Sequence, residues 1–244
     1  ALNIANSTLC GNTAVDAGGA VWATDPIEIR RSTLCNNVVT TTLTGLPGGG
    51  AVAAIGPNGQ LDIQRSTLDA NSALRGGAIS TDGAVIDLRS NTIVAPPTLP
   101  VGALGSVLRH NGADGTNLMN LFNNSFIGQC SYLTAGVVPD AAFHNIEASG
   151  NTCRMLLAGT ASNNQIAVSG NSINLAPLAD NGGPTDTRLP QAPSIAIDGG
   201  FNFACTALDQ RGSARTDSLC DVGAVEVSGT VPPDPVFANG FESP

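Results

Sequence analysis

The sequence contains no lysine, so all ten of its Lys and Arg positions are arginines. They are outnumbered by 19 aspartates and glutamates, which gives a formal net charge of −9 and an isoelectric point near 4.4. A nucleic-acid-binding surface needs clustered cations that neutralise phosphates, so this balance argues against nucleic acid as a partner. A charged fraction of only 12% also excludes a coiled coil.

Several other signals are missing. No apolar run approaches the roughly 20 residues of a transmembrane helix, and the first residues show no charged region followed by an apolar stretch, as a signal peptide would. The six cysteines form no Cys-x-x-Cys pair and none lies beside a histidine, which argues against zinc. An even cysteine count in a lysine-free chain rich in Gly, Asn and Thr instead predicts disulfides formed in an oxidising compartment.

What the sequence does contain is an eight-residue repeat. Each copy has apolar residues at positions one, three and eight, Ser or Asn at position six, and Thr or Ser at position seven, which we call the anchor. The copies occupy residues 2–9, 27–34, 61–68, 86–93, 119–126, 146–153 and 166–173. Successive anchors are 20 to 34 residues apart.

This repeat predicts an all-β fold. The apolar-x-apolar start is typical of a short strand with one face inward, and the polar pair before the last apolar residue suits a corner. One fixed strand per irregular period, with loops of variable length, indicates the coils of a parallel β-helix. A β-sandwich would need hairpin signals every 8–12 residues instead. We therefore expect about seven coils over residues 1–174.

Two further motifs recur in step with the repeat. Gly-Gly-Ala followed by Val or Ile stands at 18–21, 49–52 and 76–79, where glycine permits positive φ and close approach of neighbouring coils. Asn12, Asn37 and Asn71 each follow their anchor by four residues. Stacked amides can satisfy one another along the axis of such a fold, so these three predict a structural asparagine ladder.

The cysteines fit the same register. Cys10 and Cys35 each follow an anchor by two residues in consecutive coils, which places them close enough for a disulfide. We expect Cys130 to pair with Cys153 across a loop. Cys205 and Cys220 lie outside the repeats and would close a short terminal loop. No cysteine is near a histidine, so we expect no catalytic thiol.

Between the inward residues, acids and arginines are predicted to share one outward face. Acids or asparagines stand five residues before the anchors. Three residues before the anchors stand Ala5, Arg30, Gln64, Arg89 and Phe122, and Arg31 and Arg65 flank this position. The candidate ligand-binding residues are Glu28, Arg30, Arg31, Asp62, Arg65, Asp87 and Arg89. Three interpretations remain open: an ion-paired solvated surface, a saccharide-binding surface without chemistry, and the acid, base or metal ligands of a polysaccharide lyase or hydrolase.

Other chemistry is weakly indicated. His110 and His144 lie in different predicted loops without an acid at a telling distance, so we assign no catalytic residue. The run from Asn111 to Asn117 loosely resembles an oxygen-rich calcium loop, but it lacks the final bidentate acid of an EF-hand, and we interpret it as a turn. We predict no metal site and no cofactor, and leave only calcium open.

The pattern changes after Ile173. Three stretches follow: Leu-Ala-Pro-Leu-Ala-Asp-Asn-Gly-Gly-Pro-Thr-Asp-Thr at 175–187, Asp-Gln-Arg-Gly-Ser-Ala-Arg at 209–215, and Cys-Asp-Val-Gly-Ala-Val-Glu at 220–226. They closely resemble the C-terminal signature of bacterial secreted β-helix proteins with a choice-of-anchor Q domain. The repeat motifs also look like those of polymorphic outer-membrane proteins and related adhesins. The resemblance implies a right-handed parallel β-helix exported to the bacterial cell surface or the medium, and it brings no catalytic residues.

We divide the rest of the chain into two segments. Residues 175–228 are expected to form an irregular, disulfide-containing cap over one end of the β-helix, with calcium at Asp180, Asp186 or Asp198 left open. Residues 229–244 begin as a Pro-rich linker. They then present Phe237 and Phe241, which we expect to dock onto the rod, a sorting factor or a neighbouring subunit.

Together these features predict an exported, extracellular or cell-surface structural protein without enzymatic activity, serving adhesion, matrix or filament building. The expected partners are further copies of the chain, arranged head to tail, or surface and matrix glycans. The alternative is a β-helix polysaccharide lyase or glycoside hydrolase, or a passive saccharide-binding module, that uses the acid and arginine face.

Overall fold

The computed structural model describes residues 1–41, 48–56, 59–83, 85–112, 118–215 and 219–227. Within these residues, strands dominate and assemble into parallel sheets. Two sheets have seven strands each, a third has five, and β3 (Thr13–Ala14) pairs with β7 (Val38–Val39) in a two-stranded ladder. The expectation of an all-β parallel fold is confirmed.

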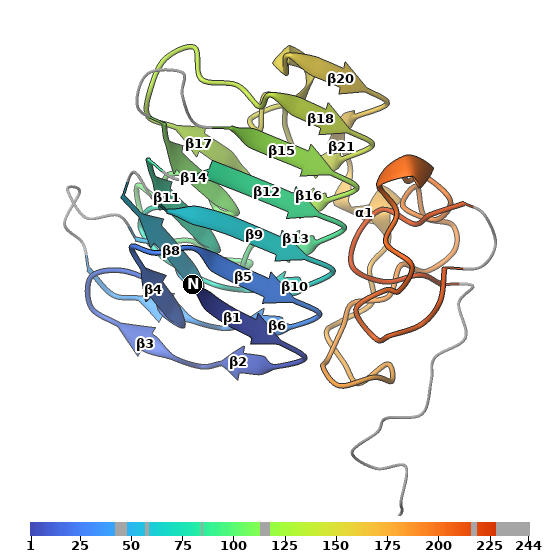
Figure 1. Cartoon of the computed structure of the whole chain (residues 1–244), viewed down its shortest axis with the longest axis horizontal. Helices are drawn as coiled ribbons and strands as arrows, with labels where there is room; N and C mark the ends of the chain where they lie inside the picture. Colours follow the sequence, from blue (N-terminus) through green and yellow to red (C-terminus); the bar gives the residue numbers. More distant parts are fainter. Residues whose placement is uncertain (42–47, 57–58, 84, 113–117, 216–218, 228–244) are drawn as a thin grey trace, which may run out of the picture.

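The strands fall into three sheets, which we number in chain order (Figure 1). The first sheet contains β1 (Leu2–Ala5), β5 (Ile27–Arg30), β9 (Gln60–Gln64), β12 (Val85–Arg89), β15 (Met119–Phe122), β18 (Ala141–Phe143) and β20 (Thr160–Ser162). The second contains β2 (Thr8–Cys10), β6 (Thr33–Cys35), β10 (Thr67–Asp69), β13 (Thr92–Val94), β16 (Ser125–Ile127), β19 (Ile146–Ala148) and β21 (Gln165–Val168). The third contains β4 (Val21–Ala23), β8 (Val52–Ile55), β11 (Ile79–Asp82), β14 (Leu108–Asn111) and β17 (Cys130–Tyr132).

In its first five passages the chain runs through the first, second and third sheets in turn and then returns to the first sheet beside the strand that it left. The last two passages, β18–β19 and β20–β21, contain strands of the first and second sheets only. We call each such passage a circuit. Corresponding residues of the first five repeats pair directly: Thr33 lies between Thr8 and Thr67 in the second sheet, and Thr92 lies between Thr67 and Ser125. The register predicted for these five copies is therefore confirmed.

The register predicted for the last two copies is wrong. Ile146, expected to begin a strand of the first sheet, instead pairs with the anchor Ser125 in the second. The adjacent Glu147, expected on the outward face, is buried, and its carboxylate accepts hydrogen bonds from Thr152 and Cys153. The first-sheet strands of circuits six and seven are β18 and β20, whose sequences Ala-Ala-Phe and Thr-Ala-Ser lack the apolar-x-apolar pattern.

A column of side chains just before the strands of the second sheet explains this register. In each circuit the backbone N–H of one member donates to the side-chain oxygen of the next, and the asparagines also donate through their amide groups. The column consists of Ser7, Ser32, Ser66, Asn91, Asn124, Asn145 and Asn164. The predicted ladder of Asn12, Asn37 and Asn71 is present as a second column, with amide contacts of 2.9 Å.

The core lies between the three sheets. Inward residues of the first sheet, such as Ile29 and Ile63, meet Leu34 and Leu68 of the second sheet and Val52 of the third, and all five are fully buried or nearly so. The Gly-Gly motifs allow this close stacking. A Cβ atom on Gly19 would lie 2.1 Å from the carbonyl oxygen of Gly50 in the next circuit, so no larger residue fits there without moving the backbone.

The segment from residue 175 lies beside the second sheet and not over the end of the stack (Figure 1). The amide of Gln210 bridges Thr33 and Thr67, at 2.9 and 2.6 Å, and the N–H of Ala224 donates to Thr92 at 3.0 Å. Further along, Val222 packs against Ile146. These contacts follow the anchor column from the second circuit to the sixth, which corrects the expected end cap: the segment covers a flank of the stack.

The segment is irregular. Its described secondary structure amounts to isolated antiparallel bridges and the 3-10 turn η2 (Asn202–Ala204), while η1 (Met155–Leu157) and α1 (Gly170–Ile173) precede it. The expected tail with Phe237 and Phe241 lies outside the described residues.

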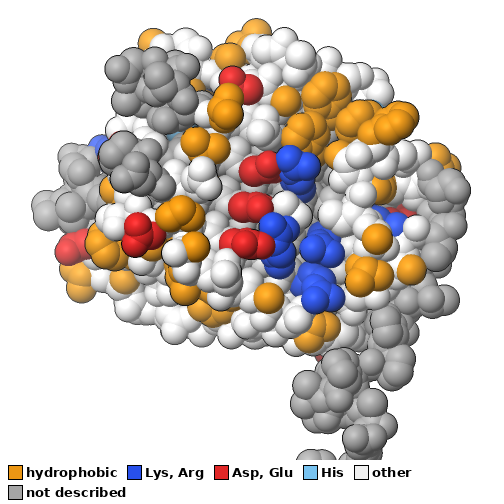
Figure 2. Space-filling view, in the orientation of Figure 1, with side chains coloured by type: hydrophobic (Ala, Val, Ile, Leu, Met, Phe, Trp, Pro, Cys, Tyr) orange, Lys and Arg blue, Asp and Glu red, His pale blue; other side chains and the backbone are white. Residues whose placement is uncertain are grey.

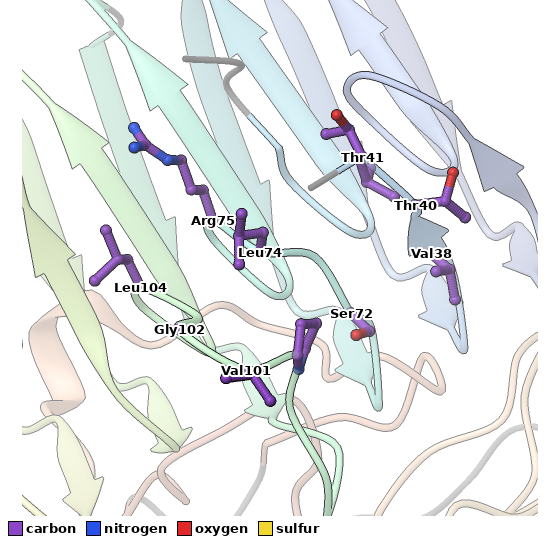
Figure 3. Close-up of a pocket in the computed structure, with 11 residues that line it drawn as sticks. Val38, Thr40, Thr41, Ser72, Leu74, Arg75, Val101, Gly102 and Leu104 are labelled. Carbon is purple, nitrogen blue, oxygen red and sulfur yellow. The ribbon is translucent and has the colours of Figure 1, made fainter. Parts of the chain in front are cut away.

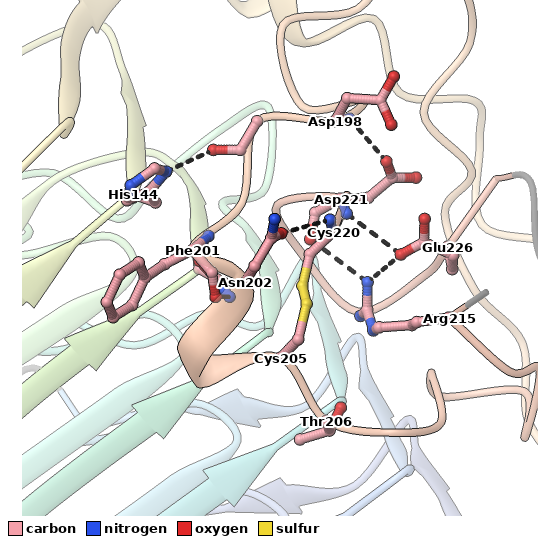
Figure 4. Close-up of a disulfide and its surroundings, with 12 residues drawn as sticks. His144, Asp198, Phe201, Asn202, Cys205, Thr206, Arg215, Cys220, Asp221 and Glu226 are labelled. Atoms are coloured by element: carbon pink, nitrogen blue, oxygen red, sulfur yellow. Dashed lines mark hydrogen bonds and ion pairs between the residues drawn. A yellow bond between two sulfur atoms is a disulfide. The ribbon is translucent and has the colours of Figure 1, made fainter. Parts of the chain in front are cut away.

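Three disulfides join the expected cysteine pairs. Cys10–Cys35 links β2 to β6 with Cα atoms 4.5 Å apart, and Cys130–Cys153 links the third sheet to the loop before η1 with Cα atoms 4.8 Å apart. Cys205–Cys220 closes the C-terminal segment on itself beside Asn202 (Figure 4). Two bridges therefore fasten successive circuits and one fastens the flanking segment.

Candidate functional site

The outward face of the first sheet carries three columns of side chains in register. The acid column contains Asn3, Glu28, Asp62, Asp87 and Asn120, and the second column contains Ala5, Arg30, Gln64, Arg89, Phe122 and Phe143. At the corner that follows each strand stands a third column, Asn6, Arg31, Arg65, Ser90, Asn123, His144 and Asn163. Figure 2 shows the acids and arginines side by side on this face, with hydrophobic side chains beyond them. The structure thus brings all seven predicted ligand-binding residues together.

Part of this charge is neutralised by ion pairs. Arg30 contacts Glu28 on its own strand and Asp62 on the next strand, where the guanidinium lies 2.9 Å from the carboxylate. Arg89 binds both oxygens of Asp87, at 2.6 and 2.7 Å. These side chains are partly exposed, and exposed pairs contribute little to stability. These ion pairs hold the acid column in place, and carboxylate oxygens of the column keep lone pairs that can accept further hydrogen bonds.

Asp62 occupies the centre of the acid column. One carboxylate oxygen accepts from Arg30 and Gln64, whereas the other is buried and has no hydrogen-bond partner among the described residues. Burial raises the pKa of this carboxyl above its usual value; Arg30 opposes the shift and the neighbouring Asp87 and Glu28 add to it. Asp62 therefore takes up a proton more readily than an ordinary aspartate does.

Arg31 and Arg65 are different from the other arginines of the face. They lie in adjacent circuits of the corner column. The backbone N–H of Arg31 donates to the carbonyl of Gln64, the residue before Arg65, and the backbone N–H of Arg65 donates to the carbonyl of Arg89 in the following circuit. Neither side chain forms a hydrogen bond or ion pair with any described residue, and the Nε of Arg65 is buried. Burial, followed by repulsion from Arg31 and Arg30, lowers the pKa of Arg65, although a guanidinium remains charged at neutral pH.

An aromatic cluster continues the face beyond the arginines. Phe122 and Phe143 stack at 5.7 Å between ring centroids, and Phe201 of the C-terminal segment stacks on Phe143 at 5.2 Å. Arg89 lies over the ring of Phe122, linking the charged and aromatic parts. Phe203, which is 94% exposed, extends the cluster outward.

Sequence reasoning noted Phe122 in its column but missed the rest of the cluster. Phe143 was hidden by the wrong register of the sixth repeat, and Phe201 comes from a segment expected elsewhere. The column of Ser and Asn before the strands of the second sheet was the available signal: aligning Asn145 with Asn124 places Phe143 beside Phe122.

The surroundings of the two histidines do not indicate a catalytic role for either of them. His110 was expected in a loop but lies in β14, where it is buried and its Nδ1 is 2.7 Å from the hydroxyl of Thr81. Burial lowers the pKa of His110 to about 4, so it is neutral at pH 7. His144 stands at a corner, with Nδ1 2.9 Å from the carbonyl of Gly199 and its ring stacked on Phe201.

A separate groove of about 580 Å³ lies where the second sheet turns toward the third (Figure 3). Its lining is mostly aliphatic, including Val38, Leu74, Val101 and Leu104, and Arg75 is its one charged residue among those described. The buried Nε of Arg75 has no hydrogen-bond partner. With a single charge, this groove provides shape but no set of groups for catalysis.

The C-terminal segment contains a buried charge cluster (Figure 4). Arg215 pairs with Glu226, whose carboxylate also accepts the N–H of Asp221, and Asp221 accepts the N–H of Asp198. Burial raises the pKa of both Asp221 and Glu226. A second pair joins Arg211 to Asp209 at 2.9 Å. These ion pairs and hydrogen bonds hold the segment together, although the buried Nε of Arg215 has no hydrogen-bond partner among the described residues.

Within the described ranges, no three His, Cys, Asp or Glu side chains gather closely enough to hold a metal ion. The candidate calcium ligand Asp180 accepts the N–H of Gly182, as in an ordinary turn. The loop residues 113–117 lie outside the described residues. None of the described helices has the length and apolar character required to cross a bilayer.

Comparison with known proteins adds no relative to this picture: no family model matches the chain, and neither a curated protein nor a solved structure is significantly similar to it.

Proposed function

We propose that this protein is an extracellular structural and adhesion protein, a right-handed parallel β-helix that holds glycans on the outward face of its first sheet. The β-helix accounts for parallel strands that recur once per circuit, and crossover connections between parallel strands are almost always right-handed. Disulfides that fasten successive circuits suit an oxidising, extracellular setting. The resemblance of residues 175–226 to exported bacterial proteins supports the same location.

One observation carries the glycan-binding part: carboxylates, guanidinium groups and aromatic rings share one exposed face in register (Figure 2). Carboxylates accept hydrogen bonds from sugar hydroxyls and guanidinium groups donate them. Aromatic rings offer flat apolar surface to the C–H faces of a sugar ring. The columns repeat about every 4.8 Å, so the face suits an extended chain of sugars.

A glycan array tests this function. The wild-type protein should bind a subset of surface or matrix glycans, and Phe203→Ala should weaken that binding by removing an exposed ring of the aromatic cluster. Val101→Ala provides the matched control, since Val101 is 98% exposed and lies on the groove away from the first sheet. Absence of binding across a broad array, or equal binding by the Phe203→Ala variant, would contradict the proposal.

A polysaccharide lyase or hydrolase is the second candidate, favoured by the raised pKa of Asp62 beside Arg30 and Arg65. A carboxyl whose pKa is raised by burial, next to guanidinium groups, suits acid or base work. Uronic-acid polymers should then be cleaved, as measured by absorbance of unsaturated products and by reducing ends, and Asp62→Ala and Arg65→Ala should abolish the cleavage. If the protein cleaves no member of a broad panel of polysaccharides, the lyase or hydrolase function is excluded and the glycan-binding function remains.

Self-association is the third part of the proposal. Within the described residues, β1, β2 and β4 each pair on one side only, and Trp22 and Val15 of the first circuit are largely exposed. A second copy stacked end to end would cover these strands. Size-exclusion chromatography of the chain with and without residues 229–244 tests this; monomers at all concentrations would contradict it.

A further inference from the structure

We propose that Arg31 and Arg65 form an anion-binding site for the carboxylate or sulfate groups of an acidic polysaccharide. This inference rests on the proposed glycan-binding function and names the class of glycan. The two guanidinium groups stand in neighbouring circuits at one edge of the first sheet, next to the acid column.

The first argument is that these charges lack partners. Every other arginine of the face is paired: Arg30 with Glu28 and Asp62, and Arg89 with Asp87. Arg31 and Arg65 have no hydrogen bond or ion pair among the described residues, and the buried Nε of Arg65 makes no hydrogen bond. Two adjacent guanidinium groups repel each other, and an anion between them removes that repulsion and satisfies their N–H groups.

The second argument comes from the backbone. Every residue of the corner column adopts the left-handed conformation, with φ of 48° at Arg31 and 51° at Arg65. Asparagine tolerates this conformation best among residues with a side chain, and it occupies the column at Asn6, Asn123 and Asn163. Arginine is poorly suited to this conformation. Two successive arginines therefore add backbone strain at this edge of the sheet and place positive charge there.

The surroundings determine which polyanion fits. The carboxylates of Glu28, Asp62 and Asp87 run parallel to the arginines on the same face. A ligand with dense charge on all sides, such as a nucleic acid, is repelled by them and by the net charge of −9. A polysaccharide with an anionic group on one edge and hydroxyls on the other satisfies both columns, because its hydroxyls donate to the carboxylates.

The chain supplies a matched control. Arg154 also has left-handed φ, at 52°, but its guanidinium lies over the ring of Tyr132 and donates to the carbonyl of Val137. Arg31→Asn, Arg65→Asn and Arg154→Asn therefore remove the same charge from the same backbone conformation. The first two leave no partner unsatisfied, whereas the third loses two contacts.

The experiment measures binding of the full chain to polygalacturonate, chondroitin sulfate, neutral dextran, inorganic sulfate and a DNA oligonucleotide, together with melting temperature. We expect wild type to bind an acidic polysaccharide, and Arg31→Asn and Arg65→Asn each to weaken that binding by about tenfold or more without lowering the melting temperature. Arg154→Asn should keep the binding and melt at a lower temperature. Binding should also weaken as salt is added.

Four results would overturn the inference: acidic polysaccharide bound equally by the two corner variants, equal loss of binding in Arg154→Asn, binding of inorganic sulfate alone, or stronger binding of DNA. If wild type binds neutral glycans and the corner variants do so equally, the anion site is refuted and the proposed function stands. If no glycan of any charge binds in these assays or on the array, the proposed function fails too.

Discussion

At the scale of single residues, the fold depends on columns of side chains that form the same hydrogen bonds in successive circuits. The amide of Asn124 accepts from the backbone and side chain of Asn91 and donates to Leu88 and Asn145. The side chain of Asn124 thus satisfies a backbone N–H and a backbone carbonyl of the preceding circuit, which would otherwise lack partners, and also bonds to the side chain of the following circuit.

Asn124→Ala should consequently destabilise the protein by about 3 kcal/mol, because several buried polar groups lose their partners at once. Ser7→Ala in the same column should cost less than about 1 kcal/mol, since the only side-chain hydrogen bond lost is the exposed one from the Ser7 hydroxyl to the carbonyl of Ala5. Urea unfolding monitored by circular dichroism measures both. Equal effects would show that the column is not what fixes the circuits.

The raised pKa of Asp62 predicts a pH dependence with a definite sign. A carboxyl whose pKa is higher in the folded than in the unfolded state binds protons more tightly when folded. Its contribution to stability is therefore present below the unfolded pKa and is lost as pH rises through the folded pKa. Relative to Asp62→Asn, wild type should become less stable as pH rises from about 4 toward 7.

Denaturant unfolding of both proteins across that pH range tests the sign. A difference in unfolding free energy that grows in favour of wild type as pH rises would contradict it. Asp87→Asn provides a comparison on the same face.

At the scale of elements, the sequence predicted the strands wherever side chains alone determine them. Apolar-x-apolar followed by a polar corner located five circuits and two columns of the candidate face correctly. It failed in circuits six and seven, where Ala142 and Ala161 replace large apolar residues and chance octets at 146–153 and 166–173 fit the pattern better. Backbone pairing and the asparagine column decided the register there.

The position of the C-terminal segment could not be predicted from the repeats. Its contacts with the stack depend on the anchor hydroxyls of Thr33, Thr67 and Thr92, whose outward direction makes them look like solvated corner residues in the sequence. Only the folded segment brings Gln210 and Ala224 to them. The aromatic cluster of the candidate face, which needs Phe201, was hidden for the same reason.

Gln210→Ala should loosen this segment from the stack. Gln210 is fully buried and its amide contacts Thr33, Thr67 and Thr185, so its loss should cost about 2 kcal/mol or more. Limited proteolysis should cleave within residues 175–227 faster than in wild type. Gln129→Ala, at an exposed position, is the control, and equal cleavage of both variants would contradict the lateral docking described above.

At the scale of the whole molecule, three sheets surround one apolar interior and the C-terminal segment lies along one flank (Figure 1). Disulfides fasten the circuits, and the first sheet remains exposed with its charged and aromatic columns in view. A stack of this kind presents the same chemical groups at a fixed spacing, which is what an extended ligand such as a glycan chain requires.

The separation of the first and last strands of the first sheet tests this arrangement most directly. Spin labels at Asn3 of β1 and Thr160 of β20, both exposed and aligned in register across the first sheet, are separated by six inter-strand steps. At about 4.8 Å per step, double electron–electron resonance should give a single distribution centred near 29 Å, broadened by the label linkers. A distribution centred below about 20 Å or above about 40 Å would contradict the stacking of circuits on which the candidate face depends.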